Sequence, residues 1–196
     1  MDLRHWKYKT IALWITFFIS LSASGAQEPA LTETDLTTAL ENPLAPVHQG
    51  EGELWERACV DENDLTTCRI VQNLFVEREV DGKTERLGRV LQINVLYSGH
   101  PETGERVPYI SMNLPLGVDL RPGAVVKVDS GVEIALPYLQ CVNDGCAISA
   151  ILDDTLLSQL QQGQQLLVGF RAWGNTDTTV IPASLIGFTK AFNTLQ

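Results

Sequence analysis

The sequence predicts an all-β fold, an antiparallel sandwich or barrel with one short helix. From Glu51 onward the chain consists of short segments rich in β-branched and aromatic residues. Turn-forming pairs such as Asp81-Gly82 and Pro122-Gly123 separate these segments, and only one stretch carries a helical stripe. Strands at this spacing, with no helices between them, are typical of antiparallel sheets that stack or close on themselves.

The clearest strand runs from Gly88 to Tyr97. Its apolar residues alternate with Gln92 and Asn94, which places them on one face of a strand whose other face meets water. Similar composition between turn signals predicts further strands at Leu54–Cys59, Cys68–Glu77, Val107–Asn113, Ala124–Val128, Val132–Cys141, Cys146–Leu152, Gln165–Trp173 and Thr178–Ile181.

One helix is predicted between Asp153 and Gly163. Asp153 or Asp154 is suited to cap its N-terminus, and Gly163 stands where a helix C-terminus favours glycine. The side chains that form its buried stripe are Leu156, Leu157 and Leu160. Two turns make a short helix, so we expect it to close one end of the sandwich.

The first 26 residues have the features of a signal peptide. A basic segment with Arg4, Lys7 and Lys9 precedes the apolar run Ile11–Leu21, and small residues at 24–26 predict cleavage after Ala26. The apolar run is shorter than the about 20 residues that span a membrane, and no later segment is long enough, so the mature chain is expected to lack a transmembrane segment.

The mature chain divides into a flexible acidic leader at 27–51 and one domain at 52–196. The leader is rich in Thr, Glu, Ala and Pro and has no aromatic residue. The chain of 196 residues has a formal net charge of -10, and the signal peptide is its basic part. Nucleic acid is therefore excluded as a partner, because no cationic surface is available to replace phosphate counterions.

All four cysteines lie in the exported part, as expected of two disulfides in an oxidising compartment. Three connectivities are possible. The turn sequence 142–145 favours the local pair Cys141 with Cys146, and we expect Cys59 to pair with Cys68 in the same way. A zinc site fits the spacing and the histidine count poorly, so no metal is expected.

Several separated motifs together resemble one family. They are Trp55 four residues before Cys59, then Cys68, Pro115-Leu116-Gly117-Val118, Leu120, Pro122-Gly123, Val128-Asp129-Ser130-Gly131, Tyr138, Cys141, Gly145-Cys146 and the segment Pro182 to Ala191. In order and spacing they resemble the invasion-associated locus B (IalB) family of exported bacterial proteins. The resemblance implies an immunoglobulin-like antiparallel β-sandwich, located in the periplasm or at the outer membrane, in a family linked in some pathogens to entry into host cells. It brings no enzymatic activity that transfers residue by residue.

Catalytic residues are not evident. The mature chain has only His48, in the leader, and His100, in a Gly-Pro turn, and neither is placed as the base of a hydrolase. Asp153 and Asp154 are more simply a helix cap. The acidic group at Asp61, Glu62 and Asp64 lacks the ligand pattern of a calcium loop. No catalytic residue and no cofactor are therefore predicted.

Aromatic side chains are the remaining candidates for ligand binding, because they supply large contact areas at low entropic cost. Trp55 and Phe170 are assigned to the core. The candidates for a groove that binds a sugar or a peptide are Trp173, Tyr97, Tyr109 and Tyr138, with Trp173 the best exposed.

The sequence thus favours a non-enzymatic exported sandwich that acts by surface binding, in the periplasm or secreted, with peripheral association with the outer membrane left open. Its partner is an envelope or host-surface protein or glycan, and its oligomeric state is open. Two alternatives stand beside this hypothesis. One is a glycan-acting enzyme that uses paired carboxylates. The other is a chaperone-like module that pairs through a sheet edge.

Overall fold

The computed structural model describes residues 47–49, 54–62 and 65–195. The predicted signal peptide and most of the predicted leader lie outside these residues. Val47–Gln49, which the sequence assigned to the leader, forms strand β1 and pairs antiparallel with Leu74–Val76. The contribution of the leader to the described fold is therefore one short edge strand.

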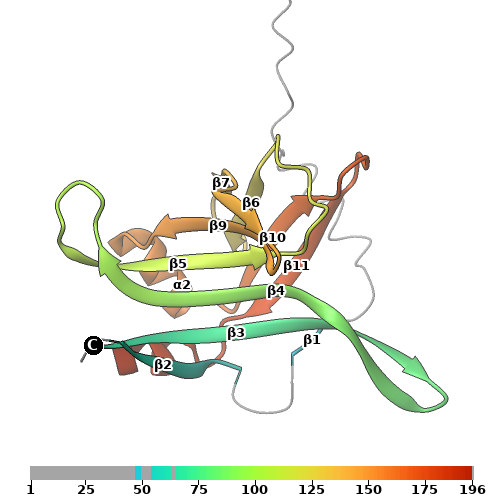
Figure 1. Ribbon diagram of the computed structural model, residues 1–196, viewed down its shortest axis with the longest axis horizontal. Helices are drawn as coiled ribbons and strands as arrows, with labels where there is room; N and C mark the ends of the chain where they lie inside the picture. The colour runs from blue at the N-terminus through green and yellow to red at the C-terminus, as the bar shows by residue number, and fades with distance from the viewer. Residues whose placement is uncertain (1–46, 50–53, 63–64, 196) are drawn as a thin grey trace, which may run out of the picture.

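A seven-stranded antiparallel sheet forms the larger layer (Figure 1). Its path runs β1-β3-β4-β5-β9-β8, and β2 pairs with β3 beside that path. The strands are β2 (Glu56–Glu62), β3 (Leu65–Val80), β4 (Lys83–Gly99), β5 (Arg106–Leu114), β8 (Gln140–Val142) and β9 (Gly145–Ile151).

A four-stranded sheet forms the second layer, in the order β11-β10-β6-β7. Its strands are β6 (Ala124–Val128), β7 (Ile134–Leu136), β10 (Gln165–Arg171) and β11 (Thr178–Ser184). Because the two sheets share one continuous core, the predicted antiparallel β-sandwich is confirmed.

The core follows from the alternation seen in the sequence. Leu91, Ile93 and Val95 of β4 are fully buried, and the residues between them are only half-buried. Val126 and Val168 of the smaller sheet belong to the same cluster. Burial of each such side chain contributes about 1.5–3 kcal/mol, which makes this interface between the sheets the main stabilising element.

The predicted helix is confirmed as α2 (Asp154–Gln162). The Asp153 carboxylate caps it by accepting a hydrogen bond from the Leu156 amide at 2.7 Å. At its other end, the Asp129 carboxylate accepts hydrogen bonds from the amides of Gln164 and Gln165 at 3.0 and 2.9 Å. Asp129 thus joins the end of β6 to the start of β10.

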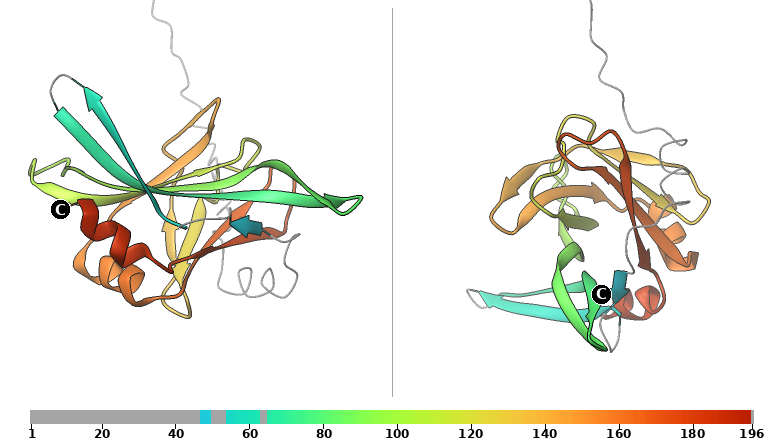
Figure 2. Two further views of the ribbon diagram at one scale, coloured as in Figure 1. Left: turned by 90° about the horizontal axis from the view of Figure 1, so that it is seen from below. Right: turned by 90° about the vertical axis from the view of Figure 1, so that its right-hand side faces the viewer.

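A second short helix, α3 (Phe188–Phe192), and the 3-10 turn η1 (Asn193–Leu195) were not predicted. Figure 2 shows α2 and α3 side by side, and the Thr189 hydroxyl donates a hydrogen bond to the Gln161 carbonyl at 2.9 Å. The Phe188 ring lies 5.1 Å from Trp55 and 5.8 Å from Phe192, measured between centroids. Five residues are too few for a helical period, so this element depends on its aromatic contacts.

The prediction of a single strand at Val132–Cys141 is wrong. The segment forms β7 in the smaller sheet and β8 in the larger one, with Pro137 between them. Proline has no amide hydrogen for a ladder and restricts the residue before it, so the chain leaves one sheet here and enters the other.

Strands β3 and β4 extend well beyond the predicted Cys68–Glu77 and Gly88–Tyr97. Their far ends form a projecting hairpin closed at Asp81-Gly82, where both residues have positive φ, 52° and 72° (Figure 1). Arg78 pairs with Glu85 at 2.8 Å across this hairpin. Charged cross-strand pairs extend the ribbon past the region that apolar alternation reveals.

Both local disulfides are confirmed. Cys59 joins Cys68 across β2 and β3, and Cys141 joins Cys146 across β8 and β9. In each case the two residues are direct partners in the antiparallel register. Pairing is therefore decided by the strand register, which sets the two cysteines of each pair directly opposite each other.

Candidate binding surface

Two loops meet at the end of the sandwich beyond β10: the loop between β5 and β6, and the loop between β10 and β11. Val118 forms an isolated bridge with Ala172. The Asp119 amide donates to the Arg171 carbonyl, and the Trp173 amide donates to the Gly117 carbonyl, each at 2.7 Å. The segment between β5 and β6 is thereby fixed to the chain that leaves β10.

Asp119 and Arg121 form the central ion pair of this end. The Arg121 guanidinium donates from Nε to Oδ1 at 2.9 Å and from Nη2 to Oδ2 at 2.8 Å. Asp119 is buried, with 3% of its surface exposed. Hydrogen bonds from Arg121 lower the pKa of the Asp119 carboxyl, with a further contribution from the positive charge of Arg171, although burial opposes the shift. The ionised carboxylate thus holds the guanidinium in one orientation.

Trp173 lies under that guanidinium and is open to solvent. The Arg121 Cζ is 5.1 Å from the centroid of the Trp173 ring, and 68% of Trp173 is exposed. Leu116 and Leu120, in the same connection as Arg121, are also exposed. We call Leu116, Leu120, Arg121 and Trp173 the Trp173 surface. The Arg121 guanidinium over the Trp173 ring and the exposed side chains of the two leucines are suited to noncovalent recognition of a partner.

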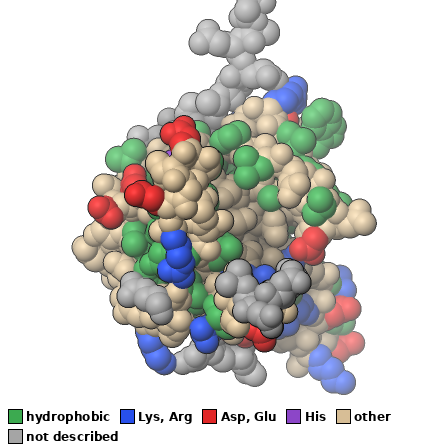
Figure 3. Space-filling view, turned by 60° about the vertical axis from the view of Figure 1, so that its left-hand side comes forward, with side chains coloured by type: hydrophobic (Ala, Val, Ile, Leu, Met, Phe, Trp, Pro, Cys, Tyr) green, Lys and Arg blue, Asp and Glu red, His purple; other side chains and the backbone are tan. Residues whose placement is uncertain are grey.

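Figure 3 shows that exposed hydrophobic side chains form separate patches on the face in view, with charged groups between them. A large contiguous apolar area would indicate an obligate interface. Isolated apolar anchors with a polar surround are typical of recognition by a few residues.

Tyr138 lies close enough to Asp119 for the charge of that carboxylate to act on its hydroxyl. Its hydroxyl is buried and has no hydrogen-bond partner among the described residues. Burial, and secondarily the negative charge of Asp119, raises the pKa of the phenol. The half-buried ring packs against the core, so Tyr138 presents less surface to a partner than Trp173 does.

Tyr97 and Tyr109 lie elsewhere. The Tyr97 ring is 5.8 Å from Phe192, and the Arg106 Cζ lies 4.1 Å from its centroid. The Tyr109 hydroxyl donates to the Gly99 carbonyl at 3.3 Å. The four aromatic candidates therefore do not line one groove, and only Trp173 is strongly exposed.

Sequence reasoning missed Asp119 and Arg121 as parts of the site. One signal was present, because an acid and an arginine two residues apart in an extended segment lie on the same side. Nothing in the sequence showed that the bridge from Val118 to Ala172 brings Trp173 to that pair.

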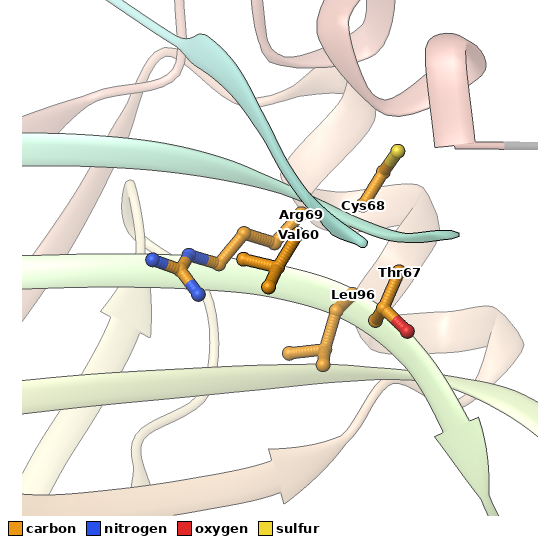
Figure 4. Close-up of a pocket in the computed structure, with 5 residues that line it drawn as sticks. All are labelled: Val60, Thr67, Cys68, Arg69 and Leu96. Carbon is orange, nitrogen blue, oxygen red and sulfur yellow. The ribbon is translucent and has the colours of Figure 1, made fainter. Parts of the chain in front are cut away.

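A hollow of about 280 Å³ lies on the outer face of the larger sheet. Val60, Thr67, Cys68, Arg69 and Leu96 line it. Figure 4 shows the sulfur of Cys68 turned away from the side chains of the other four residues. Its lining contains neither a carboxylate nor a histidine, so the groups that general acid-base chemistry commonly uses are not present in it.

The other titratable candidates have structural contacts. His100 Nδ1 accepts hydrogen bonds from the backbone amides of Glu102 and Thr103 at 3.2 and 3.4 Å. Asp61 accepts a hydrogen bond from the Thr66 hydroxyl. A carboxyl general acid requires a raised pKa, whereas the pKa of the Asp119 carboxyl is lowered.

Metal ligands were sought in the same ranges. In residues 47–49, 54–62 and 65–195, no three His, Cys, Asp or Glu side chains lie close enough together to hold a metal ion. None of the helices in that part of the chain combines the length and apolar character that a membrane crossing needs.

Comparison with known proteins identifies a matching family, two similar sequences and a similar crystal structure. The chain matches the Invasion associated locus B (IalB) protein family over residues 55–196. An invasion protein B homolog of Brucella abortus (strain 2308) is 26% identical over 191 residues, 96% of each chain, and a homolog of Brucella abortus biovar 1 (strain 9-941) gives the same figures. The crystal structure of invasion associated protein B from Bartonella henselae has a similar fold, with a TM-score of 0.54 at 18% identity, covering 76% of this chain and 94% of that one. Since the family match covers most of the sequence, this chain belongs to the invasion-associated locus B family.

Proposed function

We propose that this protein is an exported, non-enzymatic component of the bacterial envelope that acts by binding a partner protein through the Trp173 surface. The predicted signal peptide at 1–26, the leader at 27–51 and the two disulfides support export to an oxidising compartment. The mature chain then acts in the periplasm or at the outer membrane and host interface. Names of the Brucella relatives, invasion protein B homologs, are consistent with that location. The immunoglobulin-like classification of the domain at 52–196 stays part of this proposal.

One observation carries the proposal: the buried Asp119 fixes Arg121 over the exposed ring of Trp173. Leaving a tryptophan in water forgoes the stabilisation that burial of its apolar surface would give. A tryptophan already held in place loses little conformational freedom on binding, which raises affinity. Tryptophan and arginine are also the side chains that most often dominate protein-protein binding energy.

The experiment compares the purified mature protein with Trp173→Ala. Both are titrated onto separated inner-membrane, outer-membrane and cultured host-cell surfaces. Removal of a central anchor costs about 2 kcal/mol or more, so affinity should fall by about thirtyfold. Ile186→Ala is the matched control, because Ile186 is 72% exposed and follows the other end of β11. Equal binding by all three proteins would remove the Trp173 surface from the proposal.

A second candidate, pairing through a sheet edge, is supported by the projecting hairpin. The register of β4 with β5 starts at Gln92, and that of β3 with β1 ends at Val76. Among the described residues, 77–80 and 83–86 therefore pair only with each other. Such open edges accept strands from other chains. A variant in which residues 78–85 are replaced by Asn-Gly tests this candidate. If this hairpin variant loses binding to the partner surfaces while Trp173→Ala binds as well as the wild-type protein, the second candidate is favoured.

A further inference from the structure

The disulfide at the edge of the larger sheet has an unusual neighbour. Cys59 is exposed and Cys68 is half-buried, and they face each other across β2 and β3. The Arg57 guanidinium donates from Nη2 to the Cys68 sulfur at 3.1 Å. A fixed positive charge thus lies beside one of the two sulfurs, in contact with solvent.

The second disulfide has a different environment. Cys141 is exposed, but only 2% of Cys146 is exposed, and Cys146 belongs to the apolar core cluster. Both disulfides therefore combine a more exposed and a less exposed sulfur. Both less exposed sulfurs lie against the apolar core, but Cys68 is only half-buried and also has the Arg57 guanidinium beside it, whereas Cys146 is fully buried within the core.

This difference bears directly on thiol-disulfide exchange. An incoming thiolate attacks one sulfur and expels the other as a thiolate, so the reaction is faster when the leaving thiolate is stabilised. Attack on the exposed Cys59 expels Cys68 as a thiolate. The positive charge of Arg57 stabilises that leaving thiolate and so favours the reaction. Attack on Cys141 would expel a thiolate from Cys146 into the core, where desolvation disfavours the charge.

We propose that the Cys59–Cys68 pair is a thiol-exchange site that reacts with small or protein thiols of the compartment, whereas Cys141–Cys146 is purely structural. In the first step a thiolate RS⁻ bonds to the Cys59 sulfur, the bond between Cys59 and Cys68 breaks, and Cys68 leaves as a thiolate. A second RS⁻ attacks the R sulfur of the mixed disulfide, releases RSSR and leaves Cys59 as a thiolate. Two electrons pass from the two thiols to the protein, and both cysteines take up protons from water.

The fold tolerates this chemistry. The strands β2 and β3 are in register over seven residue pairs, and only one of these is the cysteine pair. Backbone pairing continues on both sides of the bond, so the hairpin stays in place when the sulfurs separate. The exchange site shares no residue with the Trp173 surface, and the proposal does not depend on the function proposed for that surface.

The test uses the oxidised mature protein and reduced glutathione as the thiol. Samples are quenched with an alkylating reagent over time and mapped by mass spectrometry. We expect Cys59 and Cys68 to become alkylated at least about tenfold faster than Cys141 and Cys146, with glutathione found transiently on Cys59 and not on Cys68. Equal rates for the two disulfides, faster reaction at Cys141–Cys146, or glutathione on Cys68 would overturn the proposal.

Arg57→Gln tests the role of the guanidinium. It should slow reduction of Cys59–Cys68 several-fold and leave Cys141–Cys146 unchanged. Arg69→Gln is the matched control, because Arg69 is an exposed arginine next to Cys68 whose side chain points to the opposite side from the Cys68 sulfur (Figure 4). If the two arginine variants reduce at the same rate, Arg57 does not assist the leaving thiolate.

Discussion

The carboxylate of Asp119 and the guanidinium of Arg121 are joined at two points, with Oδ1 and Oδ2 each accepting one hydrogen bond. The acid is buried and the arginine reaches outward to Trp173. Charge inside the fold therefore determines the orientation of a group on the surface. This arrangement makes the surface sensitive to the ionisation of one carboxyl.

That sensitivity is confined to acid pH. The pKa of Asp119 is lowered in the fold from its usual value of 3.8, so its stabilising contribution is present above that value and is lost as pH falls through the lower, folded one. In a protein of residues 27–196 carrying Trp55→Phe, Trp173 is the single tryptophan, and its fluorescence should stay constant from about pH 8 to 5 and change only below about pH 4. The further change Asp119→Asn should abolish that acid transition. A transition near neutral pH would contradict the assignment.

Tyr138→Phe should leave stability at neutral pH unchanged or slightly improved. The hydroxyl is buried without a hydrogen-bond partner among the described residues, so its removal eliminates a desolvated polar group. Because the folded pKa is raised, the wild-type protein loses stability as pH rises above about 10, the usual value, toward the folded one. Urea unfolding at pH 7 and at alkaline pH measures both effects. Marked destabilisation of the variant at pH 7 would show that the hydroxyl has a partner.

Gly145→Ala should be strongly destabilising. Gly145 has a φ of 135°, and an added Cβ would overlap the carbonyl oxygen of Leu114 on β5. Such a backbone clash, together with the strained φ, costs about 3 kcal/mol. Gly82→Ala is the control, since its φ is 72° and nothing lies within 4 Å of the added carbon. It should cost only about 1 kcal/mol, which is the conformational part. Equal losses in thermal unfolding would show that β5 yields at this point.

Phe188→Ala should remove the main support of helix α3. Phe188 is fully buried between Trp55 and Phe192, and truncation of such a ring costs about 3–5 kcal/mol. Ile186→Ala, two residues earlier and 72% exposed, should change stability by no more than about 0.5 kcal/mol. Denaturant titration followed by far-UV circular dichroism distinguishes the two variants. A small effect of Phe188→Ala would mean that α3 contributes little to the core.

Local patterns were sufficient for much of the fold. The alternation around Leu91 predicted β4, Asp153 and the leucine stripe predicted α2, and the turn at 142–145 predicted the pairing of Cys141 with Cys146. In each case the residues that interact are near one another in the chain, so their spacing reflects the contact. Trp173, predicted to be the best exposed of the four aromatic candidates, is 68% exposed.

The sequence by itself thus determined an antiparallel β fold, its capped helix and its two disulfides. Only the tertiary structure decided three features: the chain changes sheets at Pro137, helix α3 packs on Trp55 through Phe188, and Val118 pairs with Ala172. The last of these contacts brings Arg121 over Trp173 and creates the candidate surface. Such pairings join segments many residues apart, and their selection depends on how the whole core packs, which leaves no periodic signal in either segment alone.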